Sequence, residues 1–436
     1  MPRMLQGYDC SRTTILQFAL IGLQAIGASD LLSEEKNTKI TEWIKSLCIP
    51  STPQKQGETE QGKTDSQCAA GYRGGSYAGF SFNPDTPQAS LGRHDFATLA
   101  SIYSSLVSLQ ILHPHTPLRD MAPLDSIASS LHCFQNDDGS FRSTPYPSDG
   151  DTRMCYMACA IAHLCGDQWS GLNRKMLVQY LLSLQQYDGG FSGSFGGESH
   201  SGYTFCALAA LNLINEENWK QQMDMKSLMK FLLNRQIKGL NGRPNKLEDV
   251  CYSWWAGASI ALLEGTSFIQ SELLFTFIAS SEDVFTGGIK KAPEQRVSDP
   301  LHSALGLMGM CVFKDEFISR IKERVILQER YRTEKDIQEE KEDWVNQLKK
   351  QHIINDDQDE DRKKIEVKPL TRLGQLHPEL LGIQTEKEDE HKQDKDKQRQ
   401  EIKVYYPPYG DWIDEDMGIE ICLAFIDEFK EYETEK

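Results

Sequence analysis

Asp249, Cys251 and His302 offer a carboxylate oxygen, a thiol sulfur and an imidazole nitrogen, which are donor types that zinc accepts. Three protein ligands would leave a fourth coordination position open, as in catalytic zinc sites. Residues two apart do not share a helix face, so we expect Asp249 just before a helix and Cys251 in its first turn. By themselves, the same three residues could also be a helix-capping Asp, a core Cys and a hydrogen-bonded His.

A second group of residues combines cations with aromatic rings. Arg243, Lys246 and His200 come from two glycine-containing segments, and Arg and Lys together suit the binding of a diphosphate. Two solvated loop cations and a core imidazole would give the same pattern. Tyr252 and Trp255 follow directly in the chain, and their rings could line an isoprenoid tunnel or fill a core.

The cysteines form a weaker metal candidate. Cys155, Cys159 and Cys165 lie close together on an expected helix with His163 nearby, but buried free cysteines usually behave as small apolar residues. The chain has 11 cysteines at irregular spacing, which is not a disulfide framework. We therefore expect reduced thiols and a cytoplasmic protein.

Composition excludes two classes of protein. The formal net charge is −17 in 436 residues, which disfavours nucleic-acid binding, because that binding depends on neutralising phosphates. The apolar segment from Ile15 to Ile26 is too short to span a membrane, and Gln17 and Gln24 interrupt it. We predict a core helix there and a soluble protein.

Glycines recur at a constant spacing and define a repeat. Gly139, Gly189 and Gly239 are 50 residues apart, and Gly288 follows after 49. Such a period is typical of stacked supersecondary units. The segments between these glycines carry apolar residues at three- and four-residue spacing, which predicts helices over 156–164, 175–184, 204–213 and 227–234. We expect an all-α fold, an α/α toroid of about five to six helix pairs, with an open α-solenoid as the alternative.

The repeat also explains how distant residues could meet. The segments 197–206, 242–255 and 287–302 each follow a repeat turn, so closure into a toroid would bring all three to one mouth. Residues 313–436 differ in character, with 34 acidic and 23 basic side chains. We predict a toroid domain over 1–312 and a charged, partly helical or disordered C-terminal extension over 313–436.

Several motifs resemble those of one enzyme family. The combination Gly-Arg-x-Asn-Lys-x-x-Asp-x-Cys-Tyr-Ser-x-Trp at 242–255 resembles the β subunits of protein prenyltransferases. Gly-Glu-Ser-His at 197–200, the run 72–84 and the helix signature 11–23 are similar to the type I geranylgeranyltransferase branch. The resemblance covers roughly residues 10–312. It implies a zinc-dependent enzyme that attaches a geranylgeranyl group to the cysteine of C-terminal C-a-a-X sequences.

The resemblance implies a role for each matching residue of the reacting centre. Asp249, Cys251 and His302 fall on the zinc ligands, with one ion per β subunit. The diphosphate-binding positions are occupied by His200, Arg243, Lys246 and Tyr252. Lys291 stands where farnesyltransferases have an Asp, and its ammonium would replace Mg²⁺, so Mg²⁺ should not be required. Lys290 is the alternative register.

Further positions concern the two substrates. Trp255 falls on an aromatic residue of the lipid tunnel, and Thr14 and Phe18 belong to the same binding region on the first helix. Thr14 would lie at the tunnel floor, where farnesyltransferases carry Trp. His94 and Arg153 fall near the pocket for the last peptide residue, which departs from the family at two lining positions, Phe96 and Met154.

The partners follow from the same resemblance. They are a prenyltransferase α subunit, geranylgeranyl diphosphate and C-a-a-X proteins such as Rho, Rac and Rap small GTPases, with Leu preferred at the last position. Two alternatives remain, a farnesyltransferase β subunit and a non-catalytic α/α toroid that acts as a scaffold. Retention of all seven zinc and diphosphate positions argues against the scaffold.

Overall fold

The structure, a computed structural model, describes residues 10–50, 69–76, 96–215 and 219–331, with side chains up to position 321. Its contacts divide the chain into two units, and the first contains all described residues through Lys314. The second begins at Asp315 and is described to Tyr331. His94, part of the 72–84 motif and nearly all of the 313–436 extension lie outside the described residues, so the domain boundary at 312 stays a prediction.

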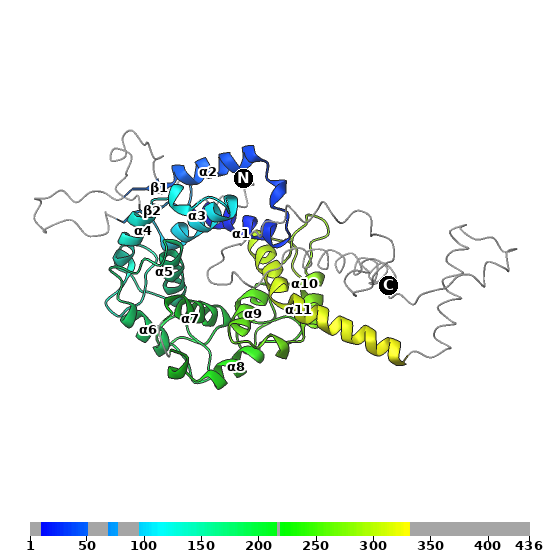
Figure 1. Ribbon diagram of the computed structural model, residues 1–436. Helices are drawn as coiled ribbons and strands as arrows, with labels where there is room; N and C mark the ends of the chain where they lie inside the picture. The colour runs from blue at the N-terminus through cyan, green and yellow to red at the C-terminus, as the bar shows by residue number, and fades with distance from the viewer. Residues whose placement is uncertain (1–9, 51–68, 77–95, 216–218, 332–436) are drawn as a thin grey trace, which may run out of the picture. The chain divides into compact units, whose positions relative to one another are not determined.

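The first unit is a ring of helices in two layers (Figure 1). The inner layer consists of α1 (Arg12–Ala25), α3 (Leu99–Leu112), α5 (Thr152–Leu164), α7 (Ser201–Ile214), α9 (Tyr252–Leu262) and the start of α11 (Pro300–Tyr331). The outer layer consists of α2 (Glu34–Ser46), α4 (Leu124–Ser130), α6 (Arg174–Ser183), α8 (Met225–Leu233) and α10 (Ser271–Ser280). The only paired strands in the described ranges are β1 (Cys48–Ile49) and β2 (Gly71–Tyr72), which are antiparallel. The predicted all-α toroid is confirmed.

The two layers differ in how much of each helix is buried. Almost every residue of α7 is buried, whereas α6 buries only Leu177, Val178 and Leu181. A helix that is apolar all round belongs to a core, and a helix with one apolar stripe covers it. The predicted helices are present, although α5 and α7 begin three or four residues earlier than their apolar periodicity indicated. None of the described helices combines the length and apolar composition needed to cross a membrane.

The periodic glycines form the turns that lead from the outer to the inner layer. Gly139 and Gly189 have φ values of +90° and +92°, a conformation that favours glycine. A Cβ at Gly189 would stand 2.1 Å from the carbonyl carbon of Ser227 in the next outer helix, so a side chain has no room there. At Gly139 and Gly189 the repeat is therefore packed closely against the next outer helix.

The ring is closed, which excludes the open solenoid. On one side of α11, Gly309 packs against Ser253 of α9. On the other side, the Cys311 thiol lies 3.8 Å from the carbonyl oxygen of Ala25 in α1. The last inner helix thus contacts both the preceding inner helix and the first one.

The inner helices begin at one end of the ring, and in all of them except α1 a side chain accepts a backbone N–H near the start. Thr98, Asp151, His200, Asp249 and Asp299 each accept a hydrogen bond from a backbone N–H two or three residues further on. These side chains satisfy N–H groups that have no partner within the helix. The same position in five successive repeats therefore lies at the mouth of the ring.

Backbone hydrogen bonds connect consecutive repeats at the same place. The N–H of the residue after each cap donates to a carbonyl in the loop of the next repeat. The bonds are Thr152 to Gly193 (2.9 Å), Ser201 to Gly242 (2.8 Å) and Val250 to Lys291 (2.8 Å). Because these N–H groups are buried, each bond strongly favours a single register between neighbouring repeats.

We predict that Gly309→Ala destabilises the protein. A Cβ there would stand 2.3 Å from Ser253 Cβ and within 3 Å of the Ser253 backbone, which cannot move aside as a flexible side chain could. Overpacking of this kind costs about 1–3 kcal/mol, more than the gain of about 1 kcal/mol from replacing a helical glycine. Thermal unfolding should show a lower melting temperature.

Gly22→Ala is the matched control. A Cβ on Gly22 would meet only Ala304 Cα, at an ordinary distance of 3.9 Å. This variant should melt at the same temperature as the wild type or slightly higher. Equal melting temperatures for the two variants would contradict the close packing of α9 on α11.

Candidate active site

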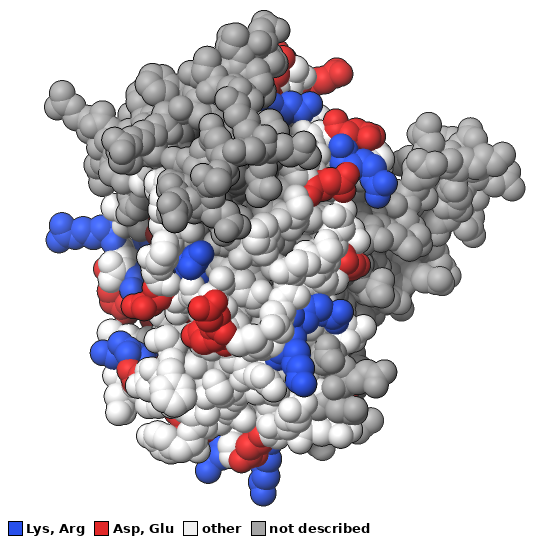
Figure 2. Space-filling model, turned by 90° about the vertical axis from the view of Figure 1, so that its left-hand side faces the viewer, with Lys and Arg blue, Asp and Glu red and all other residues white. Residues whose placement is uncertain are grey.

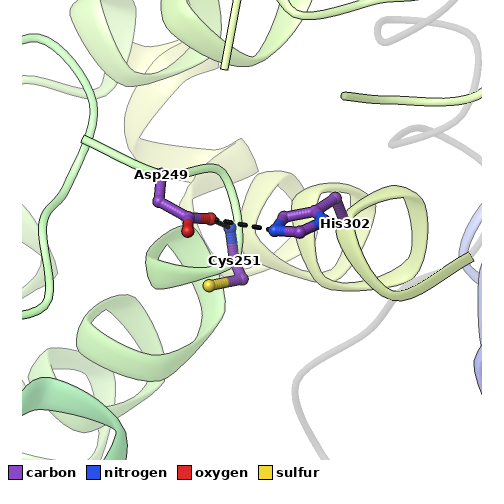
Figure 3. Close-up of side chains that lie close together, drawn as sticks. All are labelled: Asp249, Cys251 and His302. Atoms are coloured by element: carbon purple, nitrogen blue, oxygen red, sulfur yellow. Dashed lines mark hydrogen bonds and ion pairs between the residues drawn. The ribbon is translucent and has the colours of Figure 1, made fainter. Parts of the chain in front are cut away.

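Asp249, Cys251 and His302 converge at the mouth of the ring, with their donor atoms all within 4.8 Å of one another (Figure 3). Asp249 lies before α9 as predicted, whereas Cys251 is the cap residue just before the helix rather than in its first turn. The Cys251 N–H donates to Asp249 Oδ1 at 2.9 Å, and His302 Nε2 lies 3.2 Å from the same oxygen. The contact between α9 and α11 thus unites residues that are about 50 positions apart.

Asp299 orients the histidine and was not singled out as a site residue in the sequence. Its Oδ2 lies 2.6 Å from His302 Nδ1, and its Oδ1 accepts the His302 N–H at 3.0 Å. With Nδ1 occupied, Nε2 is the nitrogen that faces Asp249 and Cys251. A carboxylate behind a ligating histidine is common in zinc sites. The sequence signal that could have identified Asp299 is its position, three residues before the candidate ligand His302.

The protonation of the three residues follows from burial and mutual contacts. Burial, reinforced by the negative charge of Asp249, raises the pKa of the Cys251 thiol. Burial opposes ionisation of Asp249, but hydrogen bonds from His302 and Cys251 outweigh it, and the carboxyl pKa is lowered. Burial also opposes the charge on His302, yet its bonds to Asp249 and Asp299 raise its pKa to about 9. At neutral pH the metal-free group holds a thiol, a carboxylate and an imidazolium.

This donor set fits zinc. Bonds of about 2.0–2.3 Å in tetrahedral geometry place ligand atoms roughly 3.3–3.8 Å apart. The 3.2 Å between His302 Nε2 and Asp249 Oδ1 is already close to that range, and a spread of at most 4.8 Å needs only small side-chain rotations. Among the described residues, no other group of His, Cys, Asp and Glu meets this condition.

The cysteines near His163 are core residues. Cys155, Cys159 and Cys165 are all buried, and burial raises the pKa of Cys165 to about 12. The His163 imidazole instead pairs with Asp167 at 2.8 Å. The interpretation of these cysteines as small apolar residues therefore holds in the described structure.

A cavity of about 1090 Å³ opens beside the metal group. Asp249 forms part of its wall, and so do the cations Arg243, Lys246 and Lys291 together with His200 and Tyr252. Lys291 Nζ lies 3.4 Å from Asp249 Oδ2, so this cation stands at the border between the metal group and the rest of the cavity. One possible metal ligand, Asp249, and the cationic set are thus walls of one space, although they come from three repeats.

His200 and Tyr252 are connected by a hydrogen bond with a defined direction. His200 Nδ1 accepts from the Gly202 N–H at 3.1 Å, and its Nε2 lies 3.1 Å from the Tyr252 hydroxyl. Burial, and secondarily the charge of Arg243, lowers the pKa of His200, so the ring is neutral. The proton must then sit on Nε2 and be donated to the Tyr252 oxygen. The phenol hydrogen remains available to an anion in the cavity.

Arg153 lies on the other side of His200. Its guanidinium pairs with the Asp151 carboxylate at 2.7 Å and lies over the Tyr203 ring, 5.7 Å from its centroid. Phe96, at one of the two departures from the family pattern, packs edge-on against Tyr146. The residues assigned to the peptide pocket thus include one fixed cation, while His94 lies outside the described residues.

Sequence comparisons agree with this geometry. The prenyltransferase α/α toroid domain family matches residues 1–371. The chain belongs to this family. Geranylgeranyl transferase type-1 subunit beta of Arabidopsis thaliana is 29% identical over 331 residues, covering 73% of this chain and 82% of the relative. The protein of the same name in Dictyostelium discoideum is 29% identical over 307 residues, covering 68% and 82%.

A solved structure resembles the chain as well. Candida albicans protein geranylgeranyltransferase-I complexed with GGPP matches with a TM-score of 0.60 and 25% sequence identity. The match covers 72% of this chain and 88% of that one. The likeness therefore extends over most of the toroid.

In this prenyltransferase toroid, an aromatic column runs through the inner helices. Tyr103, Tyr156, Phe205 and Trp254 come from α3, α5, α7 and α9, and neighbouring rings lie 5.5–5.8 Å apart. Trp255 also contacts Phe205, at 5.4 Å. None of these four rings was predicted as a site residue. The first three lie five positions after the caps of their helices, and Trp254 lies five positions after Asp249, so this constant offset is the sequence signal for the column.

The two predicted lipid-site residues on α1 lie next to the inner helix that begins this column. Thr14 Oγ1 is 3.1 Å from Ser104 Oγ of α3, and Phe18 is half-buried on the same helix. Neither residue lines the 1090 Å³ cavity. Their assignment to the lipid tunnel stays a prediction.

We predict that zinc binding by the metal-free protein releases about two protons at pH 7, from the Cys251 thiol and the His302 imidazolium. Both groups must lose a proton to ligate, so zinc affinity should rise with pH and fall as pH is lowered. Calorimetric titration in buffers of different ionisation enthalpy measures the proton count. His302→Ala should release about one proton fewer, whereas His163→Ala should leave the count unchanged. Release of no protons would contradict the assigned ligands.

A second prediction concerns Asp299→Asn. Asparagine keeps the helix cap but removes the charge behind His302, so zinc affinity should fall by roughly 10-fold or more. Competition with a chelator measures the affinity. An unchanged value would show that Asp299 serves only as a cap.

Proposed function

We propose that this chain is the catalytic β subunit of a type I protein geranylgeranyltransferase. It would transfer a geranylgeranyl group from geranylgeranyl diphosphate to the cysteine thiol of C-terminal C-a-a-X proteins, with Leu preferred at the last position. The single observation that carries the proposal is the shared cavity. Asp249 belongs to a zinc-type donor group, and it lines the same space as three cations suited to a diphosphate.

The reaction is a displacement at carbon. The substrate sulfur forms a bond to C1 of the isoprenoid while the bond between C1 and the diphosphate oxygen breaks, and the diphosphate leaves with the electron pair. Arg243, Lys246 and Lys291 oppose the charge that develops on the leaving group, and the Tyr252 hydroxyl donates to it. Burial raises the Tyr252 pKa, so that proton is present at neutral pH. When bound by Asp249, Cys251 and His302, zinc would supply the Lewis acidity that keeps the substrate cysteine ionised.

The proposed setting is a cytoplasmic heterodimer. The partners would be a prenyltransferase α subunit and C-a-a-X substrates such as Rho, Rac and Rap small GTPases. The catalytic domain would be residues 1–312, with the charged residues 313–436 as an extension. By family resemblance the α subunit adds a lysine to the site, so this chain alone should be inactive.

The decisive experiment is transfer by the co-expressed heterodimer. We expect rapid labelling of a peptide ending in Leu with the C20 donor, and slower labelling with the C15 donor or a peptide ending in Met. Cys251→Ala and His302→Ala should abolish turnover. A preference for the C15 donor would favour the farnesyltransferase alternative. If a zinc-loaded heterodimer transferred no lipid at all, the non-catalytic scaffold would be the remaining alternative.

Thr14→Trp tests the basis of donor length. By resemblance Thr14 lies at the tunnel floor, where a small residue leaves room for a fourth isoprene unit. The larger indole should shift the kcat/KM ratio toward the C15 donor. Thr14→Ser, which keeps the hydroxyl that contacts Ser104, is the matched control and should retain the C20 preference. An unchanged ratio in Thr14→Trp would remove Thr14 from the argument.

Lys291→Asp tests how the leaving group is neutralised. The negative charge of a diphosphate can be neutralised by a fixed ammonium group or by a Mg²⁺ ion bound to a carboxylate. The wild type should respond little to Mg²⁺, whereas Lys291→Asp should be slow without Mg²⁺ and recover partly at millimolar concentrations.

Lys290→Asp is the control for that experiment. Lys290 is not part of the cavity wall, and its ammonium donates to the Pro293 carbonyl at 3.2 Å. The transfer rate of the Lys290→Asp variant should remain independent of Mg²⁺. A wild-type rate that rises many-fold with Mg²⁺ would contradict the role of Lys291.

A further inference from the structure

Glu198 forms an ion pair with a cation of the proposed diphosphate site. Its carboxylate contacts Arg243 Nη1, so the pair joins two consecutive repeats. Arg243 and His200 line the large cavity and also a second hollow of about 410 Å³, which Glu198 lines together with Gly193 and Gly197. An acidic side chain thus competes for a guanidinium that a diphosphate would need.

The ion pair between Glu198 and Arg243 is weak and easily broken. The Glu198 side chain is 59% exposed and that of Arg243 is 37% exposed, and one oxygen contacts one nitrogen. Exposed ion pairs of this kind contribute about 0–1 kcal/mol. Within the described ranges, Arg243 is the only partner of the Glu198 carboxylate. Nothing else in that part of the chain holds the carboxylate in place.

A diphosphate would interact with Arg243 more strongly than Glu198 does. A diphosphate carries more negative charge than one carboxylate, and two of its oxygens can match the guanidinium fork, whereas one Glu198 oxygen contacts one nitrogen. On the face shown in Figure 2, Lys and Arg side chains are interspersed with Asp and Glu rather than gathered in one basic patch. The second hollow gives the displaced carboxylate space beside the site.

We propose that Glu198 is the resident counter-ion of Arg243, displaced when a diphosphate binds and restored when the diphosphate leaves. This role rests on the proposed function of the cavity. While the diphosphate is bound, the nearby carboxylate repels it, and after the reaction the carboxylate competes again for Arg243. Glu198 therefore lowers the affinity for diphosphate and makes its release faster.

The test measures binding of inorganic pyrophosphate to the zinc-loaded heterodimer by calorimetry, without turnover. Glu198→Gln should bind pyrophosphate about two- to fivefold tighter than the wild type, the ratio expected from loss of one exposed ion pair. Glu294→Gln is the matched control. Glu294 is an exposed acid on the wall of the large cavity, so this variant removes the same charge without touching Arg243, and its effect should be smaller.

A double-mutant cycle shows whether Glu198 acts through Arg243. In an Arg243→Gln background, Glu198→Gln should tighten binding less than it does in the wild type, because only the direct repulsion between the carboxylate and pyrophosphate remains. Weaker binding by Glu198→Gln would show that the carboxylate positions Arg243 and would overturn the proposal, as would an equal effect in Glu294→Gln or no pyrophosphate binding at all. A heterodimer that binds pyrophosphate as expected but transfers no lipid would contradict the proposed function and leave the counter-ion role intact.

Discussion

The site depends on the backbone hydrogen bonds that join one repeat to the next at the start of the inner helices. Val250, which donates to Lys291, directly follows Asp249, so this bond sets the candidate metal ligand beside the cation. Ser201, which donates to Gly242, directly follows His200, and Arg243 directly follows the acceptor. Residues that are about 40 positions apart become neighbours because each adjoins a group that must find a partner when buried.

The same architecture explains why the chemistry occurs at equivalent positions. At the start of four inner helices a side chain accepts a backbone N–H at the mouth: Asp151 at α5, His200 at α7, Asp299 at α11 and, at α9, Asp249, which lies two residues before the cap residue. The structural task is identical, yet Asp151 also holds Arg153, His200 contacts Tyr252, and Asp249 and Asp299 both contact His302. A residue that is already fixed as a cap is preorganised for a second function.

The sequence predicted what local signals determine. The glycine period marked the repeats because a positive φ, as at Gly189, selects glycine. The repeat pattern predicted a toroid but left an open solenoid as the alternative, because closure rests on contacts such as Cys311 with Ala25, which no periodicity encodes. Asp299 was overlooked because an acid at a helix start already has a reason to be there. The link from Glu198 to Arg243 crosses a repeat boundary and has no spacing signature.

Closure of the ring has a consequence for how such a chain can change over evolutionary time. An open array can gain or lose a terminal unit and keep its other interfaces. Here the first and last inner helices touch, through Ala25 and Cys311. An extra helix pair would therefore have to alter the angle between every two neighbouring inner helices. One of these contacts, between α9 and α11, places Asp249 opposite His302. Closure therefore constrains the number of helix pairs, because a change in it would move the two halves of the candidate metal group apart.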